Sequence, residues 1–251
     1  MLRLATYLTA LAALAAAVLR APVWLLVLAA LAVCGWIAIG MMFPASGIFA
    51  RPFLRGRAGR SLIALTFDDG PDPETTPRIL DFLGAAGHRA TFFVIGARAE
   101  AHPALMVEIA RRGHAIGNHS FAHARSTPLW TTGRAAADIV HAQRAIAHAA
   151  GVTSRWYRPP IGLFGPRIES ASRRAGLRLC GWSLRSNDGA PPFWRYDAAR
   201  VLARIQQRLK DGDVVLLHDR PLAIEILPRL LELLEQRGLR SVTLDELADF
   251  E

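Results

Sequence analysis

Residues 61–72 read SLIALTFDDGPD, and the rest of the chain is organised around this stretch. Its first seven residues have the alternation and the branched side chains of a buried strand, which Gly70 and Pro71 end. Asp68 and Asp69 therefore lie where a strand stops and a loop begins, the position at which α/β enzymes gather their reactive groups. Because successive side chains diverge at a strand end, one carboxylate can bind a metal while its neighbour accepts a proton. By themselves, the same residues are equally typical of a turn.

Downstream of this strand, short apolar runs alternate with helical patterns up to the C-terminus. Strands that alternate with helices predict an α/β fold with a parallel sheet, and about seven such units favour a barrel-like closure. The stretch 61–251 is short for eight full units, so we expect an incomplete or distorted (β/α) barrel. The predicted strands are 61–67, 90–95, 114–117, 155–158, 177–183, 213–217 and 240–243. The predicted helices are 77–86, 103–112, 133–150, 166–175, 196–210, 221–237 and a short one from 245.

The N-terminal part of the chain is strongly apolar. Val23 to Phe43 form 21 residues without a charge, long enough to cross a hydrocarbon core of roughly 30 Å as a helix. Leu4 to Leu19 is also uncharged but 16 residues long, which fits a short first span, an interfacial helix or the core of a signal peptide. We therefore assign residues 1–50 to an anchor of one or two transmembrane helices, 51–60 to a basic linker and 61–251 to the domain that carries the chemistry.

Positive charge is concentrated ahead of that domain. Residues 1–60 hold six Arg and no Asp or Glu, and thus +6 of the formal net charge of +9. Four of these Arg follow the long apolar segment, and for a two-helix hairpin the positive-inside rule keeps the domain in the cytoplasm. A single span with Arg3 and Arg20 inside places the domain outside instead. The sequence predicts a protein anchored in the cell membrane, and it fits either side for the domain.

The basic composition does not indicate a nucleic-acid-binding protein. The pI is near 11, but the basic residues lack the clustered face with interleaved aromatics that nucleic-acid binding requires. Lys210 is the only lysine. The almost exclusive use of arginine as the basic residue indicates a compositional bias of the whole chain, not a selected basic patch. Cys34 in the apolar front and Cys180 in a predicted strand lie in different settings, so we expect neither a disulfide nor a cysteine-based zinc site.

A second polar motif, HSFAH, contains His119 and His123. On a helical turn, four-residue spacing places both imidazoles on one face, as a shared metal requires. Together with Asp69 they offer two nitrogens and one oxygen and leave coordination positions for water and substrate. The alternative is a polar loop with two unrelated histidines.

Three further polar groups follow predicted strands. Arg158 opens the rigid turn RPPIG, where its guanidinium can hold a free Asp in place and keep it ionised. Asp188 lies in SNDG and His218 ends VVLLH; a His at a strand end with an Asp to orient it suits a general acid. Considered alone, Arg158 also fits a purely structural role. His218 alone also fits a buried core histidine whose hydrogen bonds are all formed within the protein. Five converging strand ends favour one shared site.

In order and spacing, TFDDGPD, HSFAH, RPPIG, the Asp188 segment and LLH closely resemble the motifs of the polysaccharide deacetylases of the NodB-homology type, carbohydrate esterase family 4. The resemblance covers residues 61–251. It implies a distorted (β/α) barrel and metal-assisted hydrolysis of an N-acyl group, usually N-acetyl, on an amino sugar.

The resemblance also implies a role for each site residue. It makes Asp68 the general base and His218 the general acid, with Arg158 steadying Asp68 and Asp188 orienting His218. It implies that a divalent metal, usually zinc, binds Asp69, His119 and His123. The substrate contacts that it implies are Pro159, Pro160, Ile161, Gly162 and Leu216.

Two motifs depart from the family pattern. Ile161 stands where many members have Tyr or Phe, which keeps a backbone donor for the oxyanion but loses an aromatic wall. RSNDG at 185–189 stands where many members have Asp-x-x-Asp-Trp, so the first Asp and the Trp are missing. Trp182 and Trp194 are candidate replacement stacking surfaces. We therefore expect a substrate in a polysaccharide or a lipid-linked glycan. The alternatives are a non-catalytic sugar-binding homologue, and an O-deacetylase or other metal hydrolase on the same site.

Overall fold

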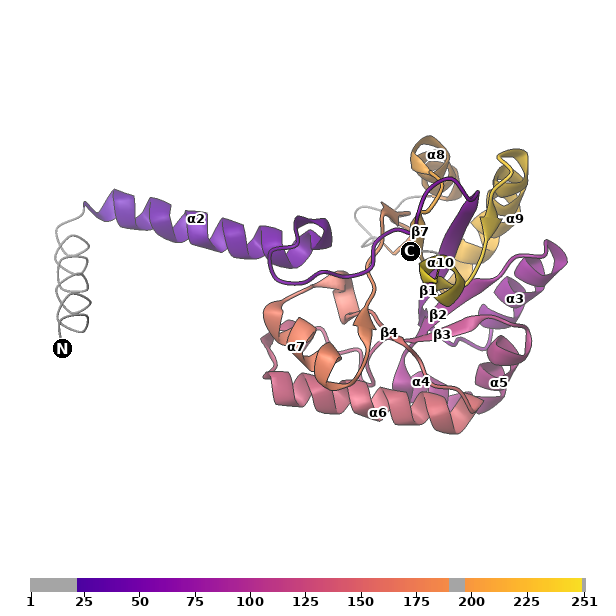
Figure 1. Cartoon of the computed structure of the whole chain (residues 1–251), viewed down its shortest axis with the longest axis horizontal. Helices are drawn as coiled ribbons and strands as arrows, with labels where there is room; N and C mark the ends of the chain where they lie inside the picture. The colour runs from indigo at the N-terminus through magenta and orange to yellow at the C-terminus, as the bar shows by residue number, and fades with distance from the viewer. Residues whose placement is uncertain (1–21, 190–196, 250–251) are drawn as a thin grey trace.

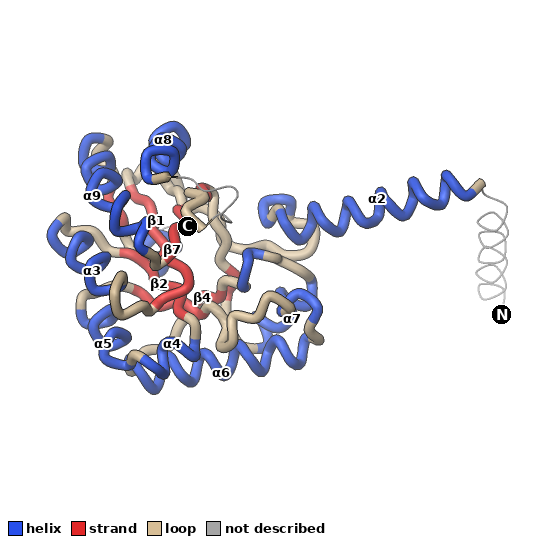
Figure 2. The backbone as a smooth tube through the Cα atoms, turned by 180° about the vertical axis from the view of Figure 1, so that it is seen from behind, coloured by secondary structure: helices blue, strands red, loops and turns tan. Residues whose placement is uncertain are grey.

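The computed structural model describes residues 22–189 and 197–249 (Figure 1). Helices surround a central parallel sheet, and one long apolar helix extends away from this domain (Figures 1 and 2). The expected first apolar segment, Leu4 to Leu19, and Trp194 lie outside the described residues. The α/β distorted barrel predicted from the sequence is confirmed.

The sheet follows the order β5-β4-β3-β2-β1-β7-β6, with β8 paired to the start of β1, and every strand pair in the described residues is parallel. β5 and β6 form the two ends of this path, so the barrel is open between them. The strands are Leu62–Gly70 (β1), Ala90–Val94 (β2), Ala115–Asn118 (β3), Trp156–Tyr157 (β4), Arg178–Leu179 (β5), Leu184–Arg185 (β6), Val214–His218 (β7) and Arg240–Ser241 (β8).

The helices follow the strands as expected, with one addition. The short helix α4 was not predicted, because it begins at Gly96, a residue that disfavours helix. The helices are Val23–Met42 (α2), Thr76–Ala85 (α3), Gly96–Ala101 (α4), Pro103–Arg111 (α5), Thr132–Ala150 (α6), Pro166–Arg174 (α7), Ala198–Arg208 (α8), Pro221–Gln236 (α9) and Leu244–Ala248 (α10). Three 3-10 turns are Pro44–Ser46 (η1), Thr127–Leu129 (η2) and Pro160–Gly162 (η3).

Strand β1 is buried on both faces along its whole length. Ile63, Leu65 and Phe67 pack into the larger apolar cluster with side chains of α3 and α9. Ala64 points the other way, into a second cluster that contains Phe93 and Trp156. Since side chains alternate along a strand, Thr66 and Asp68 share this inner face, and the strand thereby directs one carboxylate into the barrel.

The expected basic linker at 51–60 packs in part against the domain. Phe53 is buried, its N–H donates to the Leu179 carbonyl at 2.9 Å and its carbonyl accepts from the Gly181 N–H at 2.9 Å. The Gly56 N–H donates to the Gly212 carbonyl at 2.8 Å. The strand expected at 177–183 is shorter in the structure and covers only β5, Arg178–Leu179. The backbone groups of Leu179 and Gly181 form hydrogen bonds with Phe53 instead of continuing the strand. Domain packing therefore begins ahead of residue 61.

Helix α2 has 20 residues and a mean hydropathy of 2.5, and it is long and apolar enough to cross a membrane. A signal sequence near the N-terminus has the same length and composition. These two properties therefore establish an N-terminal apolar helix, which fits either a membrane anchor or a signal sequence. The end of α2 contacts the domain, because the Met41 carbonyl accepts a hydrogen bond from the Phe164 N–H at 2.9 Å.

Candidate active site

The end of β1 is shaped so that its two carboxylates separate. A bulge falls between Asp68 and Gly70, and Asp69 adopts a left-handed backbone with φ of 73°. The Asp69 carbonyl accepts from Arg98 Nη1 at 3.0 Å. Gly70 is required because a Cβ there would lie 2.5 Å from Asp219 Oδ2. The Asp219 N–H in turn donates to the Asp68 carbonyl at 2.8 Å, which fixes this turn against the loop after β7.

Asp69, His119 and His123 converge, and their ligand atoms all lie within 4.8 Å of one another. His119 Nδ1 lies 2.8 Å from the Arg158 carbonyl, so this nitrogen carries the proton and Nε2 turns to Asp69 Oδ1 at 3.5 Å. His123 Nε2 lies 3.2 Å from the same oxygen. Tetrahedral zinc with bonds of about 2.0–2.1 Å requires ligand atoms roughly 3.3 Å apart. The three side chains therefore fit a divalent metal.

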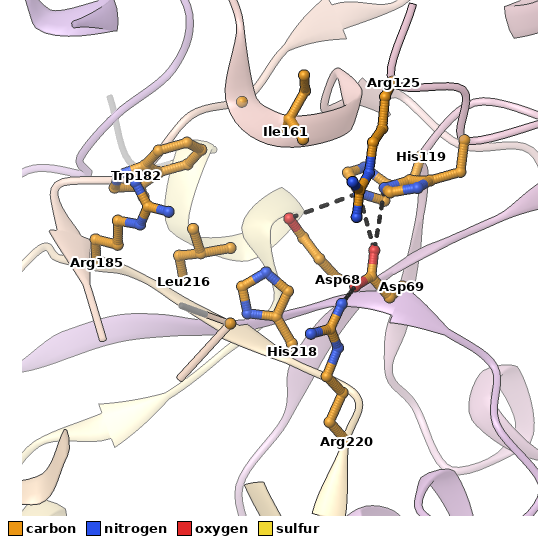
Figure 3. Close-up of a pocket in the computed structure, with 13 residues that line it drawn as sticks. Asp68, Asp69, His119, Arg125, Ile161, Trp182, Arg185, Leu216, His218 and Arg220 are labelled. Atoms are coloured by element: carbon orange, nitrogen blue, oxygen red, sulfur yellow. Dashed lines mark hydrogen bonds and ion pairs between the residues drawn. The ribbon is translucent and has the colours of Figure 1, made fainter. Parts of the chain in front are cut away.

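The charge state of Asp69 also suits a metal ligand. Burial raises the pKa of Asp69, but hydrogen bonds from His119 and His123 and the charges of His119 and His218 outweigh this effect and hold the pKa well below its usual value. Arg220 Nη2 adds a 2.5 Å contact to Asp69 Oδ2. One carboxylate oxygen thus faces the histidines and the other faces the arginine (Figure 3).

The expected helical turn for HSFAH is wrong. Ser120 and His123 have left-handed backbones, with φ of 67° and 47°. The loop is held by side chains, because the Ser120 N–H donates to Asn118 Oδ1 and the His123 N–H donates to Ser120 Oγ, both at 2.9 Å. The four-residue spacing brings both imidazoles to one metal site through this loop, not through a helix face.

Asp68 is held by a fully buried arginine. Arg158 Nη1 donates to Asp68 Oδ1 at 2.6 Å and to Thr66 Oγ1 at 2.9 Å, and Nη2 donates to the Gly181 carbonyl at 2.8 Å. Its guanidinium carbon lies 4.1 Å from the centre of the Phe93 ring. Burial lowers the pKa of Arg158, but the Asp68 carboxylate and Cys180 raise it above the usual value. The ion pair occupies Oδ1 of Asp68 and leaves Oδ2 near the metal site, 3.9 Å from His119 Nε2.

His218 ends β7 directly beside Asp68 in the sheet register. Asp188 binds it twice: Oδ1 lies 2.8 Å from His218 Nδ1, and Oδ2 accepts the His218 N–H at 2.7 Å. Ser186 Oγ donates to Asp188 Oδ1 at 2.6 Å. Burial lowers the pKa of His218, but Asp188 and the charges of Asp68 and Asp69 raise it above its usual value. The imidazole is therefore protonated more readily than free histidine, with Nε2 left for the substrate.

These groups open into one pocket of about 710 Å³ (Figure 3). Arg158 and Asp188 lie behind its wall and act on the residues that face it. Pro159 and Pro160 are buried and are not among the lining residues, so their contact with substrate stays a prediction. The lining residues are Asp68, Asp69, His119, His123, Arg125, Ile161, Gly162, Trp182, Arg185, Gly189, Leu216, His218 and Arg220.

Three arginines among these lining residues, Arg125, Arg185 and Arg220, were not predicted, and neither was Gly189. Each lies within or immediately after a recognised motif, which is the signal that could have identified them. Arginine is so abundant in this chain that no single arginine stands out in the sequence.

The altered fourth motif changes the wall beside His218. A Cβ added at Gly189 would lie 2.4 Å from His218 Cε1, so a larger residue at this position requires a shift of one of the two groups. Trp182 does line the pocket, and its ring lies 6.0 Å from that of Phe164. The pocket keeps one aromatic wall at Trp182, and the backbone of Gly189 packs directly against the His218 ring.

Comparison with known proteins agrees with this geometry. A sequence model of the family described as polysaccharide deacetylase matches residues 55–180. The chain is 32% identical over 197 residues to a peptidoglycan-N-acetylglucosamine deacetylase of Bacillus cereus, covering 74% of this chain and 87% of that protein. It is 33% identical over 207 residues to a chitooligosaccharide deacetylase of Sinorhizobium fredii, covering 76% and 93%. The chain also matches longer peptidoglycan deacetylases, and it covers 38% of the length of these proteins.

A solved structure adds evidence on the fold alone. A CE4 family pseudoenzyme from Bacillus anthracis aligns with a TM-score of 0.73 over 82% of this chain and 71% of its own length, at 23% identity. The family model covers about half of this chain, and the Bacillus cereus relative is more than 30% identical over most of its length. The triad of Asp69, His119 and His123 brings the motifs TFDDGPD and HSFAH together. The chain therefore belongs to the polysaccharide deacetylase family, the NodB-homology proteins of carbohydrate esterase family 4.

Proposed function

We propose that this protein hydrolyses the N-acetyl group of an N-acetylated amino sugar, of the N-acetylglucosamine type, in a polysaccharide or a lipid-linked glycan. The observation that carries the proposal is one pocket in which a metal triad, a carboxylate with a free oxygen and an Asp-supported histidine meet. The names of the Bacillus cereus and Sinorhizobium fredii relatives support the sugar and the acyl group. The products are acetate and the free amino sugar.

Asp69, His119 and His123 would hold the metal. Two nitrogens and one oxygen with an open coordination position are the donor set of catalytic zinc sites, so we assign zinc to this centre. When bound, the cation supplies a Lewis acid that polarises the acyl carbonyl.

Asp68 would act as the general base. Because Arg158 occupies Oδ1, the free Oδ2 is the atom that accepts a proton from the attacking water. The oxyanion formed at the carbonyl needs a donor on the opposite side of the pocket. In the turn at η3 the Gly162 N–H already donates to the Pro159 carbonyl at 3.1 Å, so we assign this role to the Ile161 N–H.

His218 would act as the general acid. Asp188 fixes Nδ1 and favours the imidazolium, so Nε2 delivers a proton to the sugar nitrogen as the C–N bond breaks. The proton that Asp68 accepts and the proton that His218 releases balance the reaction, in which one water adds across the amide bond. The leaving group is thus a neutral amine, which is then protonated in water.

The test is release of acetate and free amine from chitotetraose and from peptidoglycan fragments by the purified full chain in detergent. Activity should require zinc and be lost with a chelator. Asp68→Asn should lower kcat by about 10²–10⁴-fold, the usual range for loss of a general base. The matched control is Asp81→Asn, an exposed carboxylate of α3 that pairs with Arg112 at 2.6 Å, away from the pocket.

Parallel assays separate the other activities. Faster cleavage of an acetylated sugar ester would assign an O-deacetylase, and cleavage of peptides would assign a peptidase. No release from any substrate by the folded, zinc-loaded chain would contradict the proposed function and favour a sugar-binding homologue.

A further inference from the structure

Two arginines that line the pocket have no counter-ion among the residues that the structure describes. Arg125 and Arg185 are exposed, and their guanidinium groups make no hydrogen bond or ion pair with any described residue. The other ionisable side chains that line the pocket do have partners: Arg158 pairs with Asp68, Asp188 pairs with His218, and Asp69 contacts Arg220 and both metal-site histidines. The pocket therefore presents uncompensated positive charge to whatever enters it.

These two arginines approach the reaction centre from different elements. Arg125 follows the metal-binding loop, whereas Arg185 ends β6, and Figure 3 shows them on different sides of the pocket. Between them, Gly189 lets the His218 ring pack directly against its backbone, since an added Cβ would lie 2.4 Å from His218 Cε1. Guanidinium groups bind phosphate through paired N–H donors. This arrangement suits a sugar that carries an anionic group, such as a phosphate ester, close to its N-acetyl group.

The pocket also lies close to the end of the apolar helix α2. Gly162 lines the pocket, and two residues later the Phe164 N–H donates to the Met41 carbonyl at 2.9 Å. Two extended residues span at most about 7 Å. Phe164 also lies beside Trp182, a second lining residue, with ring centroids 6.0 Å apart. One wall of the pocket is thus shared with the end of α2.

The rim of that wall is apolar. Ile161 is 53% exposed, where many family members have an aromatic residue. If α2 spans the bilayer, these contacts hold the pocket at the membrane surface, which is the depth at which the phosphate of a lipid-linked sugar lies. A distant polymer in a cell wall requires no such contact between the pocket and the membrane helix.

We propose that the substrate is an N-acetylated amino sugar joined through a phosphate to a membrane lipid, with the positive charge of Arg125 and Arg185 attracting the phosphate to the pocket. This inference rests on the proposed deacetylase function and names its substrate class. Since both arginines are exposed and unpaired, their effect on catalysis should be electrostatic, and it should weaken as salt screens the charges.

The test uses the zinc-loaded full chain in mixed detergent micelles and four probes. These are N-acetylglucosamine linked through phosphate to farnesol, the uncharged farnesyl glycoside, the water-soluble methyl ester of N-acetylglucosamine 1-phosphate, and a soluble disaccharide fragment that carries the lactyl carboxylate of peptidoglycan. We expect kcat/KM for the farnesyl phosphate probe to exceed that for each other probe at least tenfold. Raising NaCl from 0.05 to 0.5 M should reduce its advantage over the uncharged glycoside at least threefold.

The double variant Arg125→Gln/Arg185→Gln should reduce the advantage of the farnesyl phosphate probe over the uncharged glycoside to less than threefold. Arg144→Gln/Arg208→Gln removes the same charge from the outer helices α6 and α8 and should keep the advantage. The salt titration of the wild-type chain tests the inference even if the double variant does not fold.

Three results would overturn the inference while leaving the proposed function intact: equal rates on charged and uncharged lipid probes, a preference that salt does not change, and a preference for the soluble carboxylate fragment. If neither the four probes nor chitotetraose released acetate, the result would contradict the proposed deacetylase function itself.

Discussion

At the scale of single residues, Asp68 and Asp69 are neighbours in the sequence with separate environments. Asp68 forms a buried ion pair with Arg158, and Asp69 faces two histidines and an exposed arginine. The left-handed backbone at Asp69 produces this separation, since it turns the second carboxylate away from the strand face of the first. A metal ligand and a proton acceptor can therefore be adjacent in the chain without competing for the same partner.

Arg158→Met should destabilise the protein by about 3–5 kcal/mol, because it leaves the buried Asp68 carboxylate without its counter-ion. Urea unfolding followed by tryptophan fluorescence measures this loss. In the double variant Asp68→Asn/Arg158→Met neither charge remains buried, so most of the stability should return. A single variant as stable as the wild type would show that the ion pair does not hold the site together.

Asp188→Asn should move the alkaline limb of the kcat/KM profile to lower pH. His218 must be protonated to act as an acid, so activity falls as pH rises through its pKa. Asp188 is a cause of the raised pKa of His218, and its neutralisation therefore lowers that pKa. Rates measured from pH 5 to 10 with saturating zinc test this shift, with Asp81→Asn as the control. An unmoved alkaline limb would exclude His218 as the titrating acid.

At the scale of elements, the site depends on close packing between strands β2 and β3. Gly117 on β3 lies against Phe93 on β2, where an added Cβ would be 2.4 Å from the ring. The same ring supports the Arg158 guanidinium from one side. A backbone position without a side chain thus helps to place a catalytic ion pair several residues away.

Gly117→Ala should cost about 1–3 kcal/mol of stability, as overpacking of a filled core does, and should also lower kcat by displacing Phe93 and Arg158. Gly84→Ala on α3 is the matched control, since nothing lies within 4 Å of its added Cβ. Replacing this helical glycine should stabilise the protein by about 0.5–1 kcal/mol. Equal unfolding midpoints for the two variants would contradict the packing argument.

At the scale of the whole molecule, zinc binding should be coupled to folding. A ligand that binds only the folded state at about 100 times its Kd adds about 2.7 kcal/mol to the unfolding free energy. We expect the thermal midpoint of the chelator-treated chain to rise when zinc is restored. In Asp69→Asn the rise should be absent or much smaller. A zinc response of equal size in this variant would place the metal elsewhere.

The full chain should remain with the membrane through α2. Alkaline carbonate should leave it in the membrane fraction and detergent should extract it, because a spanning helix is released only when the bilayer is dissolved. Mass spectrometry of the extracted protein should show Val23 to Met42 still attached. A mature protein that begins after Phe43 would assign the helix to a signal sequence.

The sequence alone determined the fold class and the principal chemistry of this protein. Alternation in β1 and the order of strands and helices suffice for a parallel α/β fold, because these patterns reflect local periodicity. Asp68, Asp69, His119, Arg158 and His218 could be found from the sequence because each lies at or next to a strand end, and His123 because it follows His119 at a metal-ligand spacing. The helix α4 and the loop form of HSFAH were not predicted, since backbone pairing with the 120–121 segment and side-chain hydrogen bonds override local preference there.

Only the tertiary structure showed these polar groups in contact, and it added a partner that the sequence analysis had not named, Arg220 for Asp69. Asp188 and His218 are 30 residues apart, and Asp69 and Arg220 are 151 apart, yet both pairs are in contact. The lack of a described partner for Arg125 and Arg185, the packing of Gly189 against His218 and the contact between Met41 and Phe164 are likewise properties of the folded chain. A sequence records residue types and local periods, whereas charge compensation and the size of a pocket depend on which distant segments folding brings together.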